Sequence, residues 1–149
     1  MKINQQIILP LLVGVIMIMS TSCQQKTSDY HLIHPAHVEH IEGSEFNKVE
    51  LTEKAIERID INTEEVSEEQ TTTGQQTVKV VPYSSLIYSP MGDVWVYTVK
   101  EPHVFVRQVV KVDFIRGDKA FLSEGPPTGT PVVTQGAAEL YGTEYEVGH

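Results

Sequence analysis

The sequence contains very little cysteine. Cys23 is the only one among 149 residues, so no disulfide can form within the chain. Basic residues are also scarce, with 11 lysines and arginines against 20 aspartates and glutamates and a formal net charge of −9. This balance excludes a basic footprint for nucleic acid, because phosphate backbones would be repelled at long range. We therefore expect no nucleic-acid partner.

Recognisable catalytic motifs are absent as well. The sequence has no G-x-S-x-G nucleophile elbow, no G-x-x-x-x-G-K phosphate loop and no H-E-x-x-H zinc helix. Most acidic residues fall in segments that we expect at the surface, where a solvated charge is the usual state. We therefore predict that the protein is not an enzyme, with no catalytic residue and no bound cofactor.

The sequence also lacks an apolar run long enough to span a membrane. The longest run, residues 7–19, is interrupted only by Pro10 and Gly14, and it falls short of the roughly 20 residues that a span requires. Its length, the preceding Lys2 and the small residues before Cys23 are typical of a bacterial lipoprotein signal peptide. Residues 1–22 are therefore predicted to be that signal peptide.

Cys23 is predicted to be lipidated, for example with palmitate, and to become the first residue of the mature chain. Ser20 stands where this type of cleavage site commonly has leucine. The prediction makes the protein extracytoplasmic and membrane-anchored, in the periplasm or at the cell surface. An ordinary signal peptide or an uncleaved anchor is the alternative.

Residues 23–45 have no sustained apolar period and are predicted to be a flexible tether. Within them, histidine recurs at every third position: His31, His34, His37 and His40. Imidazole nitrogen suits zinc or copper, and several donors in one short segment could converge on a metal. Pro35 argues against one helix presenting all four. We therefore assign no metal ligand and keep a zinc or copper site as the alternative to solvated side chains.

Residues 46–142 carry the pattern of a folded domain that is mainly β. Ala55, Ile56 and Ile59 recur at helical spacing after Thr52, which predicts one short helix over 53–60 with Thr52 as its N-cap. Residues 67–77 are polar and predicted to be a long loop, and residues 143–149 a C-terminal tail.

Short strands with turns every eight to twelve residues are predicted through the rest of the domain, including one long β-prone run over 104–114. Gly92, Gly117 and Gly129 are expected in turns, which makes Arg116-Gly117-Asp118 a hairpin tip rather than a cell-adhesion motif. The sequence thus predicts a small antiparallel β-barrel or sandwich. Trp95, Tyr97 and Phe105 are expected in its core rather than in an exposed aromatic site.

Two stretches resemble one known family. They are residues 49–66 (VELTEKAIERIDINTEEV) and the segments 81–88 (VPYSSLIY), 94–97 (VWVY) and 131–142 (PVVTQGAAELYG). These resemble the opening and the closing segments of periplasmic adaptor subunits, or membrane fusion proteins, of resistance-nodulation-division efflux pumps. In that family the two ends of the chain form the membrane-proximal domain, a small β-rich module.

The resemblance covers only that domain. The polar segment 67–77 stands where the family has its barrel, lipoyl and helical-hairpin domains, so the chain lacks the parts that reach an outer-membrane channel or build the adaptor's tube. What the resemblance implies is an accessory or binding module that associates with a membrane transporter and is held at the bilayer by lipid on Cys23. The alternative hypothesis is a zinc- or copper-binding lipoprotein that uses the segment His31–His40.

Overall fold

The computed structural model describes residues 34–70 and 76–147, and all of these belong to one compact unit. The predicted signal peptide, Cys23 and His31 lie outside the described residues. Within the described part, no helix combines the length and the apolar character that crossing a bilayer requires.

The described residues form eleven strands, two α-helices and a short 3-10 helix, η1 (Tyr83–Ser85). The helices are α2 (Glu53–Ile59) and α3 (Ala137–Val147). The strands are β1 (Ala36–His40), β2 (Asn47–Leu51), β3 (Asn62–Glu65), β4 (Ser67–Gln70), β5 (Thr77–Pro82), β6 (Ile87–Tyr88), β7 (Val94–Glu101), β8 (Val104–Val109), β9 (Lys111–Arg116), β10 (Lys119–Glu124) and β11 (Pro131–Gln135).

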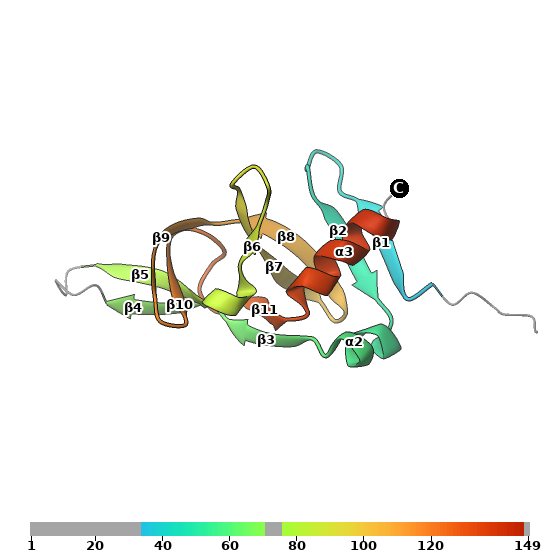
Figure 1. Ribbon diagram of the computed structural model, residues 1–149, viewed down its shortest axis with the longest axis horizontal. Helices are drawn as coiled ribbons and strands as arrows, with labels where there is room; N and C mark the ends of the chain where they lie inside the picture. The colour runs from blue at the N-terminus through green and yellow to red at the C-terminus, as the bar shows by residue number, and fades with distance from the viewer. Residues whose placement is uncertain (1–33, 71–75, 148–149) are drawn as a thin grey trace, which may run out of the picture. The chain divides into compact units, whose positions relative to one another are not determined.

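The strands build two antiparallel sheets (Figure 1). Sheet A has the order β1-β2-β8-β7-β11-β3, with β6 paired to β7, and sheet B has the order β4-β5-β10-β9. Neither sheet closes on itself among the described residues. The mainly β, sandwich-like class is therefore confirmed, whereas the barrel alternative has no closing strand pair to support it.

The chain passes from one sheet to the other at two buried valines. Val66 separates β3 from β4, and Val110 separates β8 from β9. The Val66 N–H donates to the Thr130 carbonyl at 2.9 Å, and the Val110 N–H donates to the Val94 carbonyl at 2.9 Å. Because these backbone groups stay paired at the bend, the strand can turn without burying an unsatisfied polar group. The long strand predicted over 104–114 is therefore two strands in different sheets.

The core has two parts because sheet A is covered on both faces. Adjacent residues of its central strands point to opposite sides, so Val96 and Val132 face sheet B while Tyr97 and Val133 face the helices. The cluster on the helix side comprises Ala36, Val49, Leu51, Ala55, Tyr97, Phe105, Val133, Ala137 and Leu140. The cluster between the sheets comprises Val66, Val81, Val96, Val110, Ala120, Leu122 and Val132.

The segments 46–66 and 78–142 share this interior, as the sequence predicts. Val49, Leu51 and Ala55 from the first segment pack in one cluster with Phe105 and Leu140 from the second. Trp95, Tyr97 and Phe105 are all buried, which confirms that they belong to the core.

Helix α2 forms where the sequence predicts it. The Thr52 hydroxyl accepts a hydrogen bond from the Ala55 N–H at 3.3 Å, which satisfies one free donor of the first turn. The helix ends at Asp60, whose backbone is left-handed with φ of 57°. Ala55 is buried, and Ile56 and Ile59 pack against the helix-side cluster.

Three boundaries predicted from the sequence are wrong. Strand β1 lies inside the predicted tether, because the backbone of 36–40 pairs with β2 and buries Ala36. Strand β4 lies inside the predicted loop 67–77, since backbone pairing with β5 needs no apolar side chain. Helix α3 is a second helix that the sequence did not predict, and it runs through Val147 into the predicted tail.

A single residue, Gly136, connects β11 to α3. Its φ is +85°, and an added Cβ would lie 2.8 Å from Ile59 Cγ2 and 2.9 Å from Ile61 Cγ1. Only glycine adopts this conformation without strain, and the space beside it is already filled. Gly142 lies within α3 and has nothing within 4 Å of such a Cβ.

We therefore expect opposite effects from two glycine-to-alanine substitutions. Gly136→Ala should lower the free energy of unfolding by about 1–3 kcal/mol through backbone strain and overpacking. Gly142→Ala, the matched control, should raise it by about 0.5–1 kcal/mol through helix propensity. Urea denaturation of both variants measures the difference, and equal effects would contradict the placement of Gly136.

Candidate functional site

Among the described residues, a buried and fully hydrogen-bonded polar site lies between α3 and sheet A. Strand β8 places Phe105 and Arg107 on the face that α3 covers, because side chains two apart share a face. Helix α3 brings Glu144 to the same place, two residues outside the segment 46–142 predicted as the domain. Both charged side chains are almost fully buried, with Glu144 only 1% exposed and Arg107 5%.

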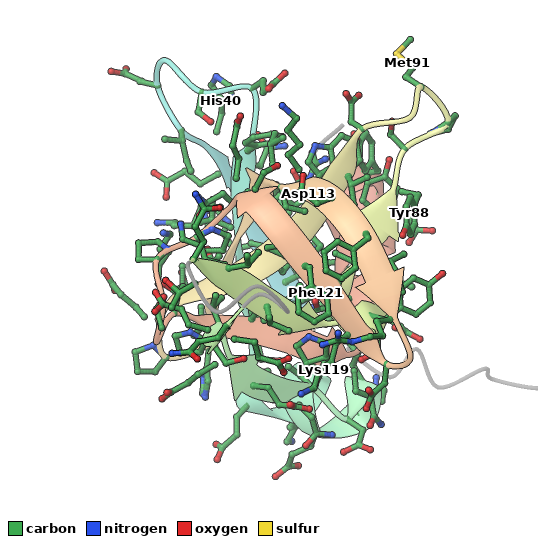
Figure 2. All side chains as sticks on the ribbon, turned by 90° about the vertical axis from the view of Figure 1, so that its left-hand side faces the viewer. His40, Tyr88, Met91, Asp113, Lys119 and Phe121 are labelled. Carbon is green, nitrogen blue, oxygen red and sulfur yellow. The ribbon has the colours of Figure 1, made fainter. Side chains whose placement is uncertain are left out.

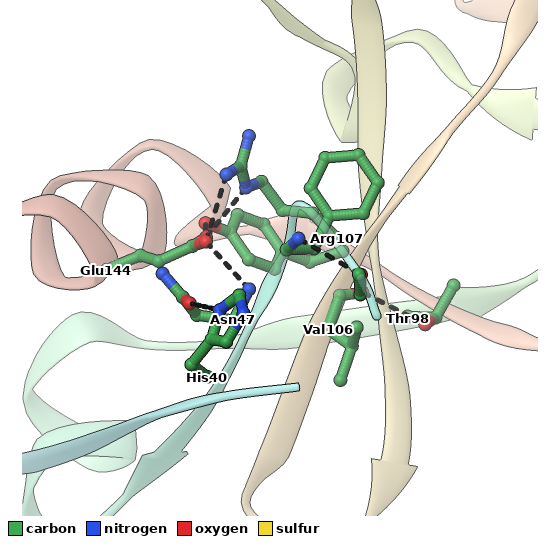
Figure 3. Close-up of polar contacts among 9 residues, drawn as sticks. His40, Asn47, Thr98, Val106, Arg107 and Glu144 are labelled. Carbon is green, nitrogen blue, oxygen red and sulfur yellow. Dashed lines mark hydrogen bonds and ion pairs between the residues drawn. The ribbon is translucent and has the colours of Figure 1, made fainter. Parts of the chain in front are cut away.

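Glu144 accepts hydrogen bonds from three elements (Figure 3). Arg107 donates from Nε to Oε2 at 2.7 Å and from Nη2 to Oε1 at 2.9 Å, which makes a bidentate ion pair. The Tyr97 hydroxyl on β7 donates to Oε2 at 2.6 Å, and the Asn47 N–H on β2 donates to Oε1 at 3.4 Å. One carboxylate thus ties α3 to three strands of sheet A.

Four aromatic rings surround the Arg107 guanidinium. Its central carbon lies 4.5 Å from the ring centroid of Trp95, 4.9 Å from Phe46 and 5.4 Å from both Tyr141 and Tyr145. At these distances a guanidinium is attracted to the negative ring faces, and the attraction is stronger where water is excluded. The arrangement is an aromatic cage whose occupant is the chain's own arginine.

The electrostatics of this site favour fixed protonation states. Burial, followed by the hydrogen bond to Glu144, raises the pKa of the Tyr97 hydroxyl far above its usual value, so the hydroxyl stays protonated as a donor. Burial by itself would lower the pKa of Arg107, but the hydrogen bond and the charge of Glu144 outweigh it and raise that pKa. All members are paired with one another, which makes this site a structural link between α3 and sheet A.

A second group of contacts lies on the face of sheet B that points away from sheet A (Figure 2). The rings of Phe114 on β9 and Phe121 on β10 stack with centroids 4.4 Å apart, and the Arg116 guanidinium lies 4.7 Å from the Phe121 centroid. Glu69 on β4 accepts from Arg116 Nη2 at 3.3 Å and also pairs with Lys119. We call these five residues, Glu69, Phe114, Arg116, Lys119 and Phe121, the outer patch of sheet B.

Two cavities open on the surface of the described part. The first, of about 320 Å³, is lined by Glu64, Glu65, Tyr83, Asp118 and Lys119 among others. The second, of about 490 Å³, lies near the first described residues and is lined by His34, Ala36, His37, Glu50, Leu51 and Thr52.

The three predicted histidines that lie among the described residues, His34, His37 and His40, do not converge as a metal site would require. His34 and His37 line the second cavity, whereas His40 lies three residues further along β1, on the opposite face of the strand. There His40 Nδ1 is 3.2 Å from Asn47 Oδ1. Within residues 34–70 and 76–147, no three histidine, cysteine, aspartate or glutamate side chains are grouped so that they could hold a metal ion.

The turn Arg116-Gly117-Asp118 joins β9 to β10, as expected of a hairpin tip, with Gly117 at φ of +64°. Sequence reasoning missed the Arg107–Glu144 pair. The one available signal was Arg107 itself, a charged residue at an inward position of a β-prone run; Glu144 gave none, because α3 was not predicted.

Comparison with known protein families, with characterised proteins and with solved structures finds no match to this chain.

Removing one partner of the buried ion pair should be costly. Glu144→Ala leaves Arg107 charged and unpaired in the interior, so we expect the free energy of unfolding to fall by about 3–5 kcal/mol. The double variant Arg107→Met with Glu144→Leu should recover much of this loss, because no charge remains buried. Glu39→Ala, which breaks an exposed pair with Lys48, is the control and should leave the urea midpoint unchanged. A small loss in Glu144→Ala would contradict the burial of the pair.

The raised pKa of Tyr97 predicts a loss of stability in alkali. The unfolded tyrosine loses its proton near its ordinary pKa of 10.0, whereas the folded one keeps it, so the unfolded state is favoured above that pH. Its stabilisation is therefore complete below about pH 10 and declines above it. Between about pH 10 and 12, the free energy of unfolding of the wild type should fall by about 1.4 kcal/mol more per pH unit than that of Tyr97→Phe. Parallel pH profiles from urea denaturation would show that Tyr97 titrates normally.

Proposed function

We propose that this chain is a lipid-anchored extracytoplasmic accessory module, built like the membrane-proximal domain of efflux adaptors, that associates with a membrane transport complex. The observation that supports it is the shared interior of the two segments that resemble that domain. Val49, Leu51 and Ala55 from the opening segment pack with Val133 and Leu140 from the closing one.

The pairing of strands supports the same proposal. Strand β2 pairs with β8, and β3 pairs with β11, so both strands of the opening segment are hydrogen-bonded to the later part of the chain. The Leu51 N–H also donates to the His103 carbonyl at 3.0 Å. These contacts bring together residues far apart in sequence, which is the arrangement that the membrane-proximal domain of an adaptor requires.

The segment 67–77, which stands in place of the inserted adaptor domains, also fits. Strand β4 lies within it and pairs directly with β5, with Ser67 opposite Val80 and Gln70 opposite Thr77. The module therefore closes through its own strands and needs no barrel, lipoyl or hairpin domain to complete its core.

A binding role suits the side chains better than catalysis does. The buried polar side chains of the described residues are all hydrogen-bonded, so no unpaired buried group is available to take part in a reaction. A lipid anchor raises the local concentration of a module near a membrane partner, which allows modest affinity to suffice. Several acyl chains, as on a mature bacterial lipoprotein, hold such a module firmly. The zinc or copper alternative is less well supported, because β1 turns His37 and His40 to opposite faces.

The anchor and the association can be tested together in the native host. Affinity purification of the full lipidated chain from membranes in mild detergent should recover a transporter subunit. Cys23→Ser should move the protein out of the membrane fraction and lose that subunit, because the anchor is gone. Glu57→Gln, on the exposed side of α2, is the control and should behave as wild type. Recovery of no transporter subunit with the lipidated wild type would count decisively against the proposal.

A further inference from the structure

Among the described residues, the outer strands of the two sheets, apart from the two-residue β6, differ in how their free edges are protected. Strands β3 and β4 are edges of four residues, and each carries two glutamates. Strand β1, the other edge of sheet A, carries two histidines and a glutamate. Charges and short length are the usual means of keeping an edge from pairing with another chain.

Strand β9 also carries charges, at Lys111, Asp113 and Arg116, but it is the longest of these edge strands. It has six residues, and its adjacent residues Phe114 and Ile115 are 48% and 46% exposed. The irregular pairing with β10 is confined to its first half, since the register shifts fall between Phe121 and Glu124. The second half, from Phe114 to Arg116, pairs regularly on one side and meets no described strand on the other.

We propose that the β9 edge and the outer patch of sheet B form a docking surface for an extended segment of a protein partner, in which a carboxylate stands beside apolar residues. The proposal deepens the proposed function and rests on it only for the identity of the partner as part of a transport complex.

The apolar half of the surface is pre-organised. Phe121 is only 4% exposed although it points away from the core, because Phe114 and Arg116 cover it. Phe114 is thereby held against a fixed ring while about half of it stays open. Binding energy concentrates in such rigid aromatic and arginine positions, which lose little entropy when a partner covers them.

The charged half of the surface favours a carboxylate on the partner. Arg116 and Lys119 share one acceptor, Glu69, and both remain half exposed or more at the side chain. A guanidinium has five N–H donors, and Glu69 engages only Nη2 of Arg116. Asp118 lies in the hairpin turn near Lys119 and accepts nothing from Arg116. A partner carboxylate can therefore add a second, charge-assisted pair to Arg116.

The backbone of β9 supplies the remaining contacts. A free edge presents unpaired N–H and C=O groups, to which an extended segment can add as a further strand. In that geometry the partner's side chains alternate between the two faces, so one set meets Phe114 and Arg116 on the outer face. The surface thus selects an extended segment rather than a helix.

The test is photo-crosslinking from defined positions of the full lipidated chain in its native membranes. Phe114→p-benzoylphenylalanine should give an adduct with a protein, mapped by mass spectrometry to a segment that has aspartate or glutamate beside apolar residues. The same probe at Glu57, exposed on α2, is the control and should give no such adduct.

Charge reversal provides the second readout. Arg116→Glu combined with Lys119→Glu should reduce the adduct yield at position 114 by about tenfold or more, as expected for loss of a hot-spot charge. Lys54→Glu, a reversal on α2, should leave the yield unchanged. Arg116→Gln, which keeps the side chain polar, guards against misfolding and should reduce the yield in the same direction.

Several outcomes would overturn the inference. These are equal yields at positions 114 and 57, an adduct only with lipid, with a second copy or within the same chain, and a yield that charge reversal does not change. The result is separable from the proposed function. A mapped, charge-dependent adduct with a protein outside any transport complex, together with no transporter subunit on purification, would sustain the docking surface and refute the proposed function. Purification of a transporter subunit without an adduct at position 114 would sustain the proposed function and refute the docking surface.

Discussion

The buried pair of Arg107 and Glu144 is the interaction on which the arrangement of this domain depends. Taking two charges out of water costs several kcal/mol for each ion, so the pair is tolerable only with complete hydrogen bonding. That bonding comes from Tyr97 and the Asn47 N–H, while aromatic rings replace water around the guanidinium. Because all these groups must be present together, α3 has one position on sheet A in which the charges are satisfied. The helix in turn covers the apolar cluster that the opening and closing segments share.

The elements that local sequence could predict are those with a local cause. Helix α2 has an N-cap at Thr52 and a one-faced apolar period, and both operate within the helix itself. The central strand β7 is apolar and aromatic along most of its length, as a strand covered on both faces must be. The turn glycines were likewise recognisable, because positive φ leaves few alternatives to glycine.

The elements that escaped prediction depend on partners distant in sequence. Strand β4 is polar, and only its pairing with β5 makes it a strand. Helix α3 has a weak apolar period and carries Gly142. Its formation therefore depends more on docking onto sheet A than on its own helix propensity. The change of sheet at Val110 has no local marker, because the β-prone pattern continues from β8 through Val110 into β9. For the same reason the buried ion pair could not be inferred: one of its members sits on an element that only the fold creates.

The bend at Val110 makes the two sheets mechanically continuous. Strand β9, whose free edge is the proposed docking surface, runs through this single valine into β8, and β8 carries Arg107. A force applied at the edge of sheet B is therefore borne by covalent backbone up to the residue that clamps the C-terminal helix. Load on one side of the molecule therefore reaches the other through the backbone of two consecutive strands and the single residue that joins them.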